Sequence, residues 1–78
     1  MKRLAAILAR VLDIDEAAIN DATSPDTVET WDSFNGLMLV SELEAHFGVK
    51  FSMDEVLSVT CVADIKNALA RHGVVLED

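Results

Sequence analysis

A serine next to an aspartate is the feature of this chain that first suggests a reaction centre. Ser33 follows Asp32 at the start of the apolar stretch in TWDSFNGLMLV. A serine hydroxyl acts as a nucleophile when a base, normally a histidine, lies beside it. His46 lies 13 residues further along the same predicted helix, roughly 20 Å away, and His72 follows the last predicted helix. The glycine-flanked nucleophile motif is also missing, so we expect no catalysis by this chain.

Ser33 has instead the setting of a modification site. It follows a long predicted loop, so a second enzyme can reach it, and it opens a helix. Free backbone N–H groups and the helix dipole favour a phosphate ester at such a position. The plainer alternative is that the serine only begins the helix, as Asp-Ser pairs commonly do. These two residues by themselves leave both interpretations open.

Metal binding and disulfide formation find little support. Cys61 is the single cysteine, so it forms no internal disulfide, which fits a reducing compartment. Cys61, His46 and His72 lack the spacing of metal ligands. The acidic stretch that begins at residue 13 has Ala18 where a calcium loop needs glycine and Ser24 where it needs glutamate. We expect no metal site.

The chain is acidic, and its charge is unevenly distributed. The net charge is −8 over 78 residues, with +3 in residues 1–12, −11 in residues 13–64 and none in residues 65–78. Nucleic acid is a poor partner because phosphate contacts need a basic face. A basic protein surface suits the charge better. An acidic surface that only confers solubility is the plainer interpretation.

Length and hydropathy indicate one small soluble domain spanning residues 1–78. The longest apolar run has four residues, 37–40, which excludes membrane insertion as a helix. The N-terminal segment has a basic pair and an apolar stretch, as a signal peptide does, but it continues into acidic residues without a convincing cleavage site. We expect a cytoplasmic monomer.

Hydrophobic spacing predicts an all-α fold, a small four-helix bundle with three longer helices and a short third one. The first helix spans about residues 2–12, and a long loop follows in which Asp15 caps a single turn. Asp32 caps the second helix, which begins at Ser33 and stops at Gly48. Its predicted inward stripe is Leu37, Val40, Leu43, Glu44 and Phe47, widened by Leu39.

The two remaining helices carry their own start signals. Ser52 and Glu55 form a capping box for the short helix, about residues 53–58. Thr60 is the predicted cap of the last helix, about residues 61–72, and Gly73 ends it.

The surroundings of Ser33 resemble those of the acyl carrier proteins. That family has an Asp-Ser-Leu motif at the start of its second helix, and the motif here reads Asp32-Ser33-Phe34. The resemblance continues through LMLVSELEAHFGVKFSMDEVLSVTCVADI, in the order and spacing of the helices, and covers nearly the whole chain. Phe34 replaces the usual leucine or methionine, and Met38 stands where primary fatty-acid carriers tend to have an acid.

The resemblance implies a function for Ser33. A phosphopantetheinyl transferase, using coenzyme A and magnesium, would join 4′-phosphopantetheine to this serine beside Asp32, making the chain a phosphoprotein. The arm's thiol would hold acyl groups as thioesters and present them to the enzymes of fatty-acid, polyketide or related specialised biosynthesis. The glycine pair that often precedes the serine of peptide-synthetase carriers is missing here, so a discrete acyl carrier is favoured.

The resemblance also implies a partner face. Besides Asp32, its predicted members are two apolar residues and three acids: Phe34, Met38, Glu42, Asp54 and Glu55. The partners would be the transferase and acyl-transferring, ligase or synthase enzymes with basic docking surfaces. Two alternatives stay open, an unmodified acidic helical interaction domain and an aminoacyl or peptidyl carrier.

Overall fold

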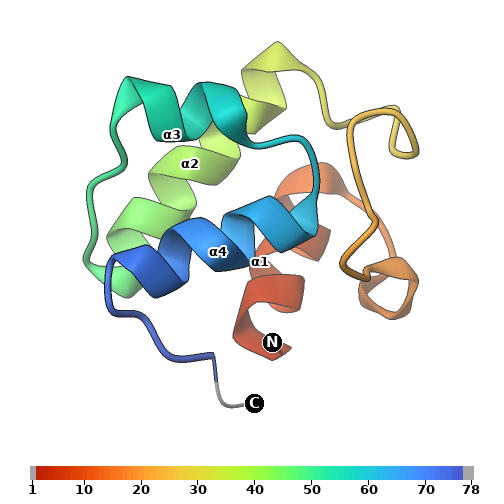
Figure 1. Cartoon of the computed structure of the whole chain (residues 1–78). Coiled ribbons are helices and arrows are strands. Elements are labelled where there is room, and N and C mark those ends of the chain that lie inside the picture. The colour runs from red at the N-terminus through yellow and green to blue at the C-terminus, as the bar shows by residue number, and fades with distance from the viewer. Residues whose placement is uncertain (1, 77–78) are drawn as a thin grey trace.

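A computed structural model describes residues 2–76, and this part of the chain contains four α-helices, one 3₁₀ helix and no strand. In Figure 1, α3 and α4 lie in front of α1 and α2, and the long loop between α1 and α2 runs down one side of the molecule. The all-α prediction of three longer helices and a short third one is therefore confirmed. Within these residues, no helix has the length and apolar character needed to span a membrane.

The core forms where α1 packs against the other helices. α1 (Lys2–Leu12) places Leu4, Leu8 and Leu12 on one face at spacings of four residues, and all three are fully buried. Val62 of α4 (Val62–Arg71) is equally buried and belongs to the same hydrophobic cluster. Leu39 and Leu43 of α2 belong to the same buried cluster, so this small leucine-rich core fixes the position of α2.

The long loop is attached to the core by its apolar side chains. Its one short helix, η1 (Glu16–Ala18), is capped by the Asp15 carboxylate, which accepts from the Ala17 N–H. Ile19 and Trp31 are buried. Because Trp31 is buried immediately before Asp32, the start of α2 is held in a fixed position.

Hydrogen bonds also hold the middle of this loop to α4. The N–H of Val62 donates to the Thr23 carbonyl at 2.9 Å, and the N–H of Ala63 donates to the Asp21 carbonyl at 3.1 Å. These bonds satisfy first-turn donors of α4 that no side chain caps.

α2 (Ser33–Phe47) begins and ends where predicted. The Asp32 carboxylate accepts from the Asn35 N–H at 2.9 Å, and Gly48 adopts φ 67°, the left-handed conformation in which glycine is favoured. One part of the prediction is wrong: Leu37 is 64% exposed, whereas Leu39 is 2% exposed. Because apolar residues occur all round this helix, the positions of α1 and α4 decide which of them are buried.

The starts of α3 and α4 differ in how well they were predicted. α3 (Met53–Ser58) has the predicted capping box between Ser52 and Glu55. α4 begins one residue later than predicted, with Cys61 at the cap position, so the prediction that Thr60 caps this helix is wrong. Thr60 instead donates its N–H and its hydroxyl to the Asp64 carboxylate, at 2.9 and 2.6 Å. Asp64, in the first turn of α4, therefore accepts hydrogen bonds from Thr60, whereas Thr60 was predicted to accept one from the first turn.

Candidate functional site

The candidate reactive group is the hydroxyl of Ser33, in the first turn of α2. The residue is exposed, and within residues 2–76 its hydroxyl has no hydrogen-bond partner. The backbone N–H groups of Ser33 and Phe34 likewise lack acceptors within this part of the chain. The hydroxyl is therefore accessible and unengaged, beside two free donors that suit an anionic ester.

Three contacts fix the start of α2 around Ser33. Asp32 receives the Asn35 N–H, and its carbonyl receives the Gly36 N–H at 2.8 Å. The side-chain amide of Asn35 reaches back to the Thr30 carbonyl at 2.7 Å. The turn is held on both sides of Ser33 while the serine itself remains free.

An apolar cleft of about 550 Å³ opens beside Ser33, between α2, α3 and α4. Ser33 and Asp32 border it together with the loop residues Pro25 and Trp31. Its walls are apolar and come from all three helices: Leu39, Val40, Leu43, Val56, Ile65 and Ala68. Its size is that of a small-molecule site, about 300–1,000 Å³.

The predicted partner residues on α2 differ in how free they are to bind a partner. Phe34 and Met38 lie four residues apart on one face and are 70% and 46% exposed. Glu42 follows Met38 by four residues, but its carboxylate forms an ion pair with Arg10 of α1 at 2.9 Å. The role of all three in partner binding remains a prediction.

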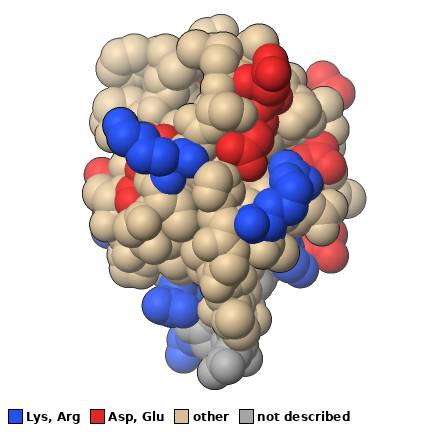
Figure 2. Space-filling view, turned by 60° about the vertical axis from the view of Figure 1, so that its left-hand side comes forward, with Lys and Arg blue, Asp and Glu red and all other residues tan. Residues whose placement is uncertain are grey.

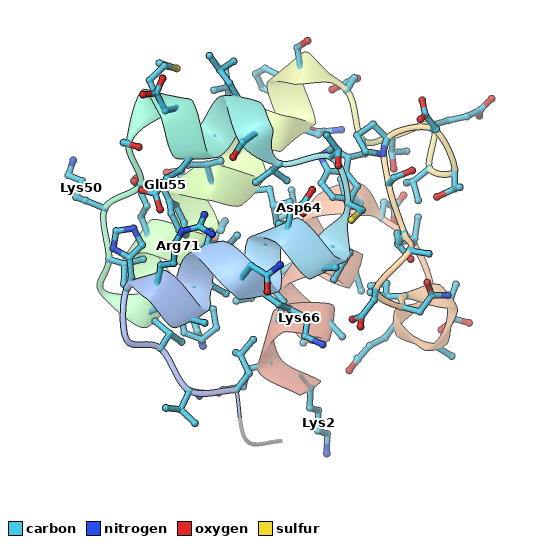
Figure 3. All side chains as sticks on the ribbon, viewed as in Figure 1. Lys2, Lys50, Glu55, Asp64, Lys66 and Arg71 are labelled. Carbon is cyan, nitrogen blue, oxygen red and sulfur yellow. The ribbon has the colours of Figure 1, made fainter. Side chains whose placement is uncertain are left out.

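The two predicted acids of α3 also differ. Asp54 is exposed and makes no hydrogen bond or ion pair within residues 2–76. Glu55 is occupied, because its carboxylate accepts from the Ser52 N–H at 2.9 Å and contacts the His72 ring at 3.0 Å. Figure 3 shows Glu55 beside Arg71, where α3 meets α4, and the Arg71 Nε lies 3.9 Å from the Glu55 carboxylate.

Three exposed apolar residues beside the site were missed by the sequence reasoning: Leu37, Met53 and Leu57, exposed by 64%, 69% and 74%. Leu37 had been assigned to the core. A signal was available, since Leu37 follows Ser33 by four residues and therefore shares its side of the helix. Met53 and Leu57 are also four residues apart, on the short α3.

Neither histidine lies in a position to activate Ser33. His46 is in the last turn of α2, opposite the end at which Ser33 stands. His72 follows α4 and is engaged with Glu55. The two free N–H groups and the apolar cleft thus surround a hydroxyl that has no base of its own among the described residues.

Hydrogen bonding lowers the pKa of Glu55 from its usual value of 4.5. The largest cause is the bond from the Ser52 backbone, and the bond to His72 adds to it. Since the folded pKa lies below the unfolded one, Glu55 stabilises the fold above the unfolded pKa. That contribution is lost as pH falls through the folded value.

We expect Glu55→Gln to lower the melting temperature at pH 7 and to converge with the wild type as the pH falls through the lowered pKa of Glu55. Differential scanning calorimetry of both chains, from pH 7 down into the acid range, would measure this difference in melting temperature. Asp54→Asn is the matched control, since this exposed acid on the same helix lacks a partner among residues 2–76. A Glu55→Gln deficit that stayed constant with pH would contradict the assignment.

Comparison with known proteins adds further evidence. The family model described as a phosphopantetheine attachment site matches residues 2–69. No curated protein matches the sequence.

Solved structures resemble the chain over most of its length. A protein of Mycobacterium tuberculosis assigned as an acyl carrier protein has a TM-score of 0.81 at 23% identity, covering 90% of this chain and 93% of its own. A holo acyl carrier protein from Geobacter metallireducens has a TM-score of 0.76 at 30% identity, covering 90% and 85%. MacpD, an acyl carrier protein of Pseudomonas fluorescens involved in mupirocin biosynthesis, has a TM-score of 0.73 at 26% identity, covering 97% and 72%.

Proposed function

The chain belongs to the acyl carrier protein family, whose cofactor is phosphopantetheine, and from this premise we propose that Ser33 is the residue to which the 4′-phosphopantetheine arm is joined. The observation that carries the proposal is the exposed Ser33 hydroxyl, unengaged within residues 2–76, at the mouth of an apolar cleft. Asp32 shapes the turn that presents it.

The surroundings of Ser33 fit a phosphate ester. Two backbone N–H groups at the start of α2 are without acceptors in the described chain, and a helix N-terminus favours negative charge. The Asp32 carboxylate is close by, but it is committed to the Asn35 N–H. Donors therefore remain for an anionic group on the serine.

The chain supplies the nucleophilic oxygen, and a transferase supplies the base. The Ser33 oxygen forms a new bond to the phosphorus of coenzyme A that bears the pantetheine. The pyrophosphate bond breaks, adenosine 3′,5′-bisphosphate leaves, and the hydroxyl proton passes to the transferase. We therefore propose that the chain catalyses nothing itself and is a substrate and partner of enzymes.

Once attached, the arm provides a thiol on which acyl groups are held as thioesters. The chain's own contribution is the cleft between α2, α3 and α4, whose apolar walls favour an aliphatic or polyketide-like chain over a charged aminoacyl group. Fatty-acid, polyketide or related specialised biosynthesis is the proposed setting. A cytoplasmic location stays a prediction from the sequence.

Intact-mass spectrometry after incubation with coenzyme A, magnesium and a broad-specificity phosphopantetheinyl transferase tests the function. We expect one phosphopantetheinyl group per chain, located by peptide mapping at Ser33. A chain that gains no mass would instead be an unmodified interaction domain. A group on another residue would leave the carrier function standing and overturn the assignment of Ser33.

A further inference from the structure

The indole N–H of Trp31 has no hydrogen-bond acceptor among residues 2–76. The side chain is only 7% exposed, and a buried tryptophan usually donates this N–H to an acceptor. In the same part of the chain, every buried or half-buried residue whose side-chain nitrogen or oxygen is sealed from solvent has a partner for that atom. The indole N–H is therefore reachable from outside, although the ring itself is buried.

The edge of the indole that carries this N–H lies against Gly36 of α2. A Cβ placed on Gly36 would be 3.8 Å from the Trp31 Nε1 and 3.9 Å from its Cδ1. Both residues line the cleft between α2, α3 and α4, as Ser33 does. Because Gly36 follows Ser33 by three residues, the two share one side of the helix. The free N–H thus lies on the same side of α2 as Ser33.

The backbone and the packing of the described chain do not require glycine at position 36. This residue is helical, and among residues 2–76 the glycines with positive φ are Gly48 and Gly73. A Cβ on Gly36 would make ordinary contacts with the ring, without a clash. Alanine is also the more favourable residue inside a helix. What the missing side chain does provide is open space beside the Trp31 N–H.

The other polar groups of the cleft favour an uncharged acceptor for this N–H. Asp32 and Glu55 border the cleft, and no lysine or arginine of residues 2–76 lines it. Figure 2 shows lysine and arginine side chains on the outer surface, some of them beside acidic ones. A carboxylate inside the cleft would lose hydration without gaining a basic partner. A carbonyl oxygen accepts an N–H without bringing a charge.

We propose that the indole N–H of Trp31, left open by Gly36, donates a hydrogen bond to an uncharged carbonyl oxygen of the group carried on Ser33. The inference rests on the proposed function and makes Trp31 a positioning residue for that group. The acceptor belongs to an amide of the arm or to a keto group of the acyl chain. One donor placed in an apolar site supplies this kind of specificity, so acyl groups with a free carboxylate are disfavoured.

A single NMR signal tests the inference, because Trp31 is the one tryptophan of the chain. The tryptophan is isotope-labelled, and the protein is loaded by a broad-specificity transferase from four donors. These are coenzyme A and its octanoyl, β-ketooctanoyl and malonyl thioesters. Intact mass confirms the loading of each sample, and the position of the indole N–H signal and its exchange with water are then measured.

We expect loading to move the indole proton signal downfield. Its exchange with water should slow by about fivefold to tenfold, as one added hydrogen bond of ordinary strength gives. A change already seen with coenzyme A supports the proposal and identifies an amide of the arm as the acceptor. A change that needs the β-ketooctanoyl group, and is missing with octanoyl, supports it and identifies the keto group.

Gly36→Ala is the variant that separates the open N–H from the buried ring. It should raise the melting temperature, because alanine favours a helix. It should also reduce the response of the indole signal to loading, because its methyl group lies beside Nε1. Ser41→Ala is the matched control, since Ser41 is an exposed residue of the same helix and does not line the cleft. We expect its indole signal to respond as in the wild type.

The outcomes separate this inference from the proposed function. A wild-type chain that gains no mass from any donor overturns both. A chain that is loaded, while its indole signal neither moves downfield nor exchanges more slowly, overturns the hydrogen bond alone. A Gly36→Ala chain that responds as fully as the wild type overturns the role of Gly36. Stronger protection by the malonyl than by the β-ketooctanoyl group would overturn the preference for an uncharged acceptor.

Discussion

Replacing Ser33 with alanine is expected to abolish phosphopantetheine loading and to leave the helical structure nearly intact. The first effect follows because the variant lacks the oxygen that forms the ester bond. The second follows because Asp32, not Ser33, caps α2, and alanine is favourable in a first helical turn. The Ser33 hydroxyl also makes no hydrogen bond within residues 2–76 that the substitution could remove.

Circular dichroism and intact mass together measure this result: a native-like spectrum with no added group. Ser41→Ala is the matched control, since Ser41 is an exposed serine in the same helix, and we expect it to load as the wild type. A Ser33→Ala chain that still gains the group would place attachment elsewhere. One that unfolds would assign Ser33 a structural role.

The second large effect concerns stability and separates a core residue of α2, Leu43, from an exposed one, Phe34. Leu43 is 2% exposed, and its truncation to alanine should lower the free energy of unfolding by roughly 2–5 kcal/mol. Phe34 is 70% exposed, and Phe34→Ala should change the free energy of unfolding by only about 0.5 kcal/mol or less. The aromatic ring is nevertheless expected to matter for loading, because it lies next to Ser33.

Urea denaturation of both variants ranks their losses in the free energy of unfolding. Transferase rates on the folded Phe34→Ala chain measure how far the ring contributes to recognition by the transferase. For a domain of this size, about 1 kcal/mol corresponds to about 4–8 °C in melting temperature, so the two variants should be clearly distinguishable. Failure of Leu43→Ala to fold would agree with the expectation, since small cores have little stability to lose. A larger loss from Phe34→Ala would make Phe34 a structural residue and remove it from the predicted partner face.

The sequence by itself determined the four helices and most of their ends. Asp15, Asp32 and the pair of Ser52 and Glu55 cap the elements that they were predicted to cap. Gly48 ends α2 in the left-handed conformation. These features depend on contacts within about four residues along the chain, so their signals are local and can be recognised without knowing the fold. Ser33 as a modification candidate was found in the same way, from its neighbours.

The tertiary structure decided which side of α2 is buried. α2 is apolar nearly all round, so spacing alone could not determine that Leu39 turns inward and Leu37 outward. The start of α4 likewise depended on distant groups, because the loop carbonyls of Asp21 and Thr23 satisfy its first donors. Thr60 then bonds to Asp64 instead of capping the helix.

Charge pairing and the cleft were also beyond the sequence. The ion pairs of Arg10 with Glu42 and of Lys66 with Asp21 join residues 32 and 45 positions apart, and no local pattern reports such separations. The cleft exists because α2, α3 and α4 converge beside Ser33. Local hydrogen bonding fixes where α2 and α3 begin. Burial and ion pairing depend on which helices meet, and only the packed chain decides that.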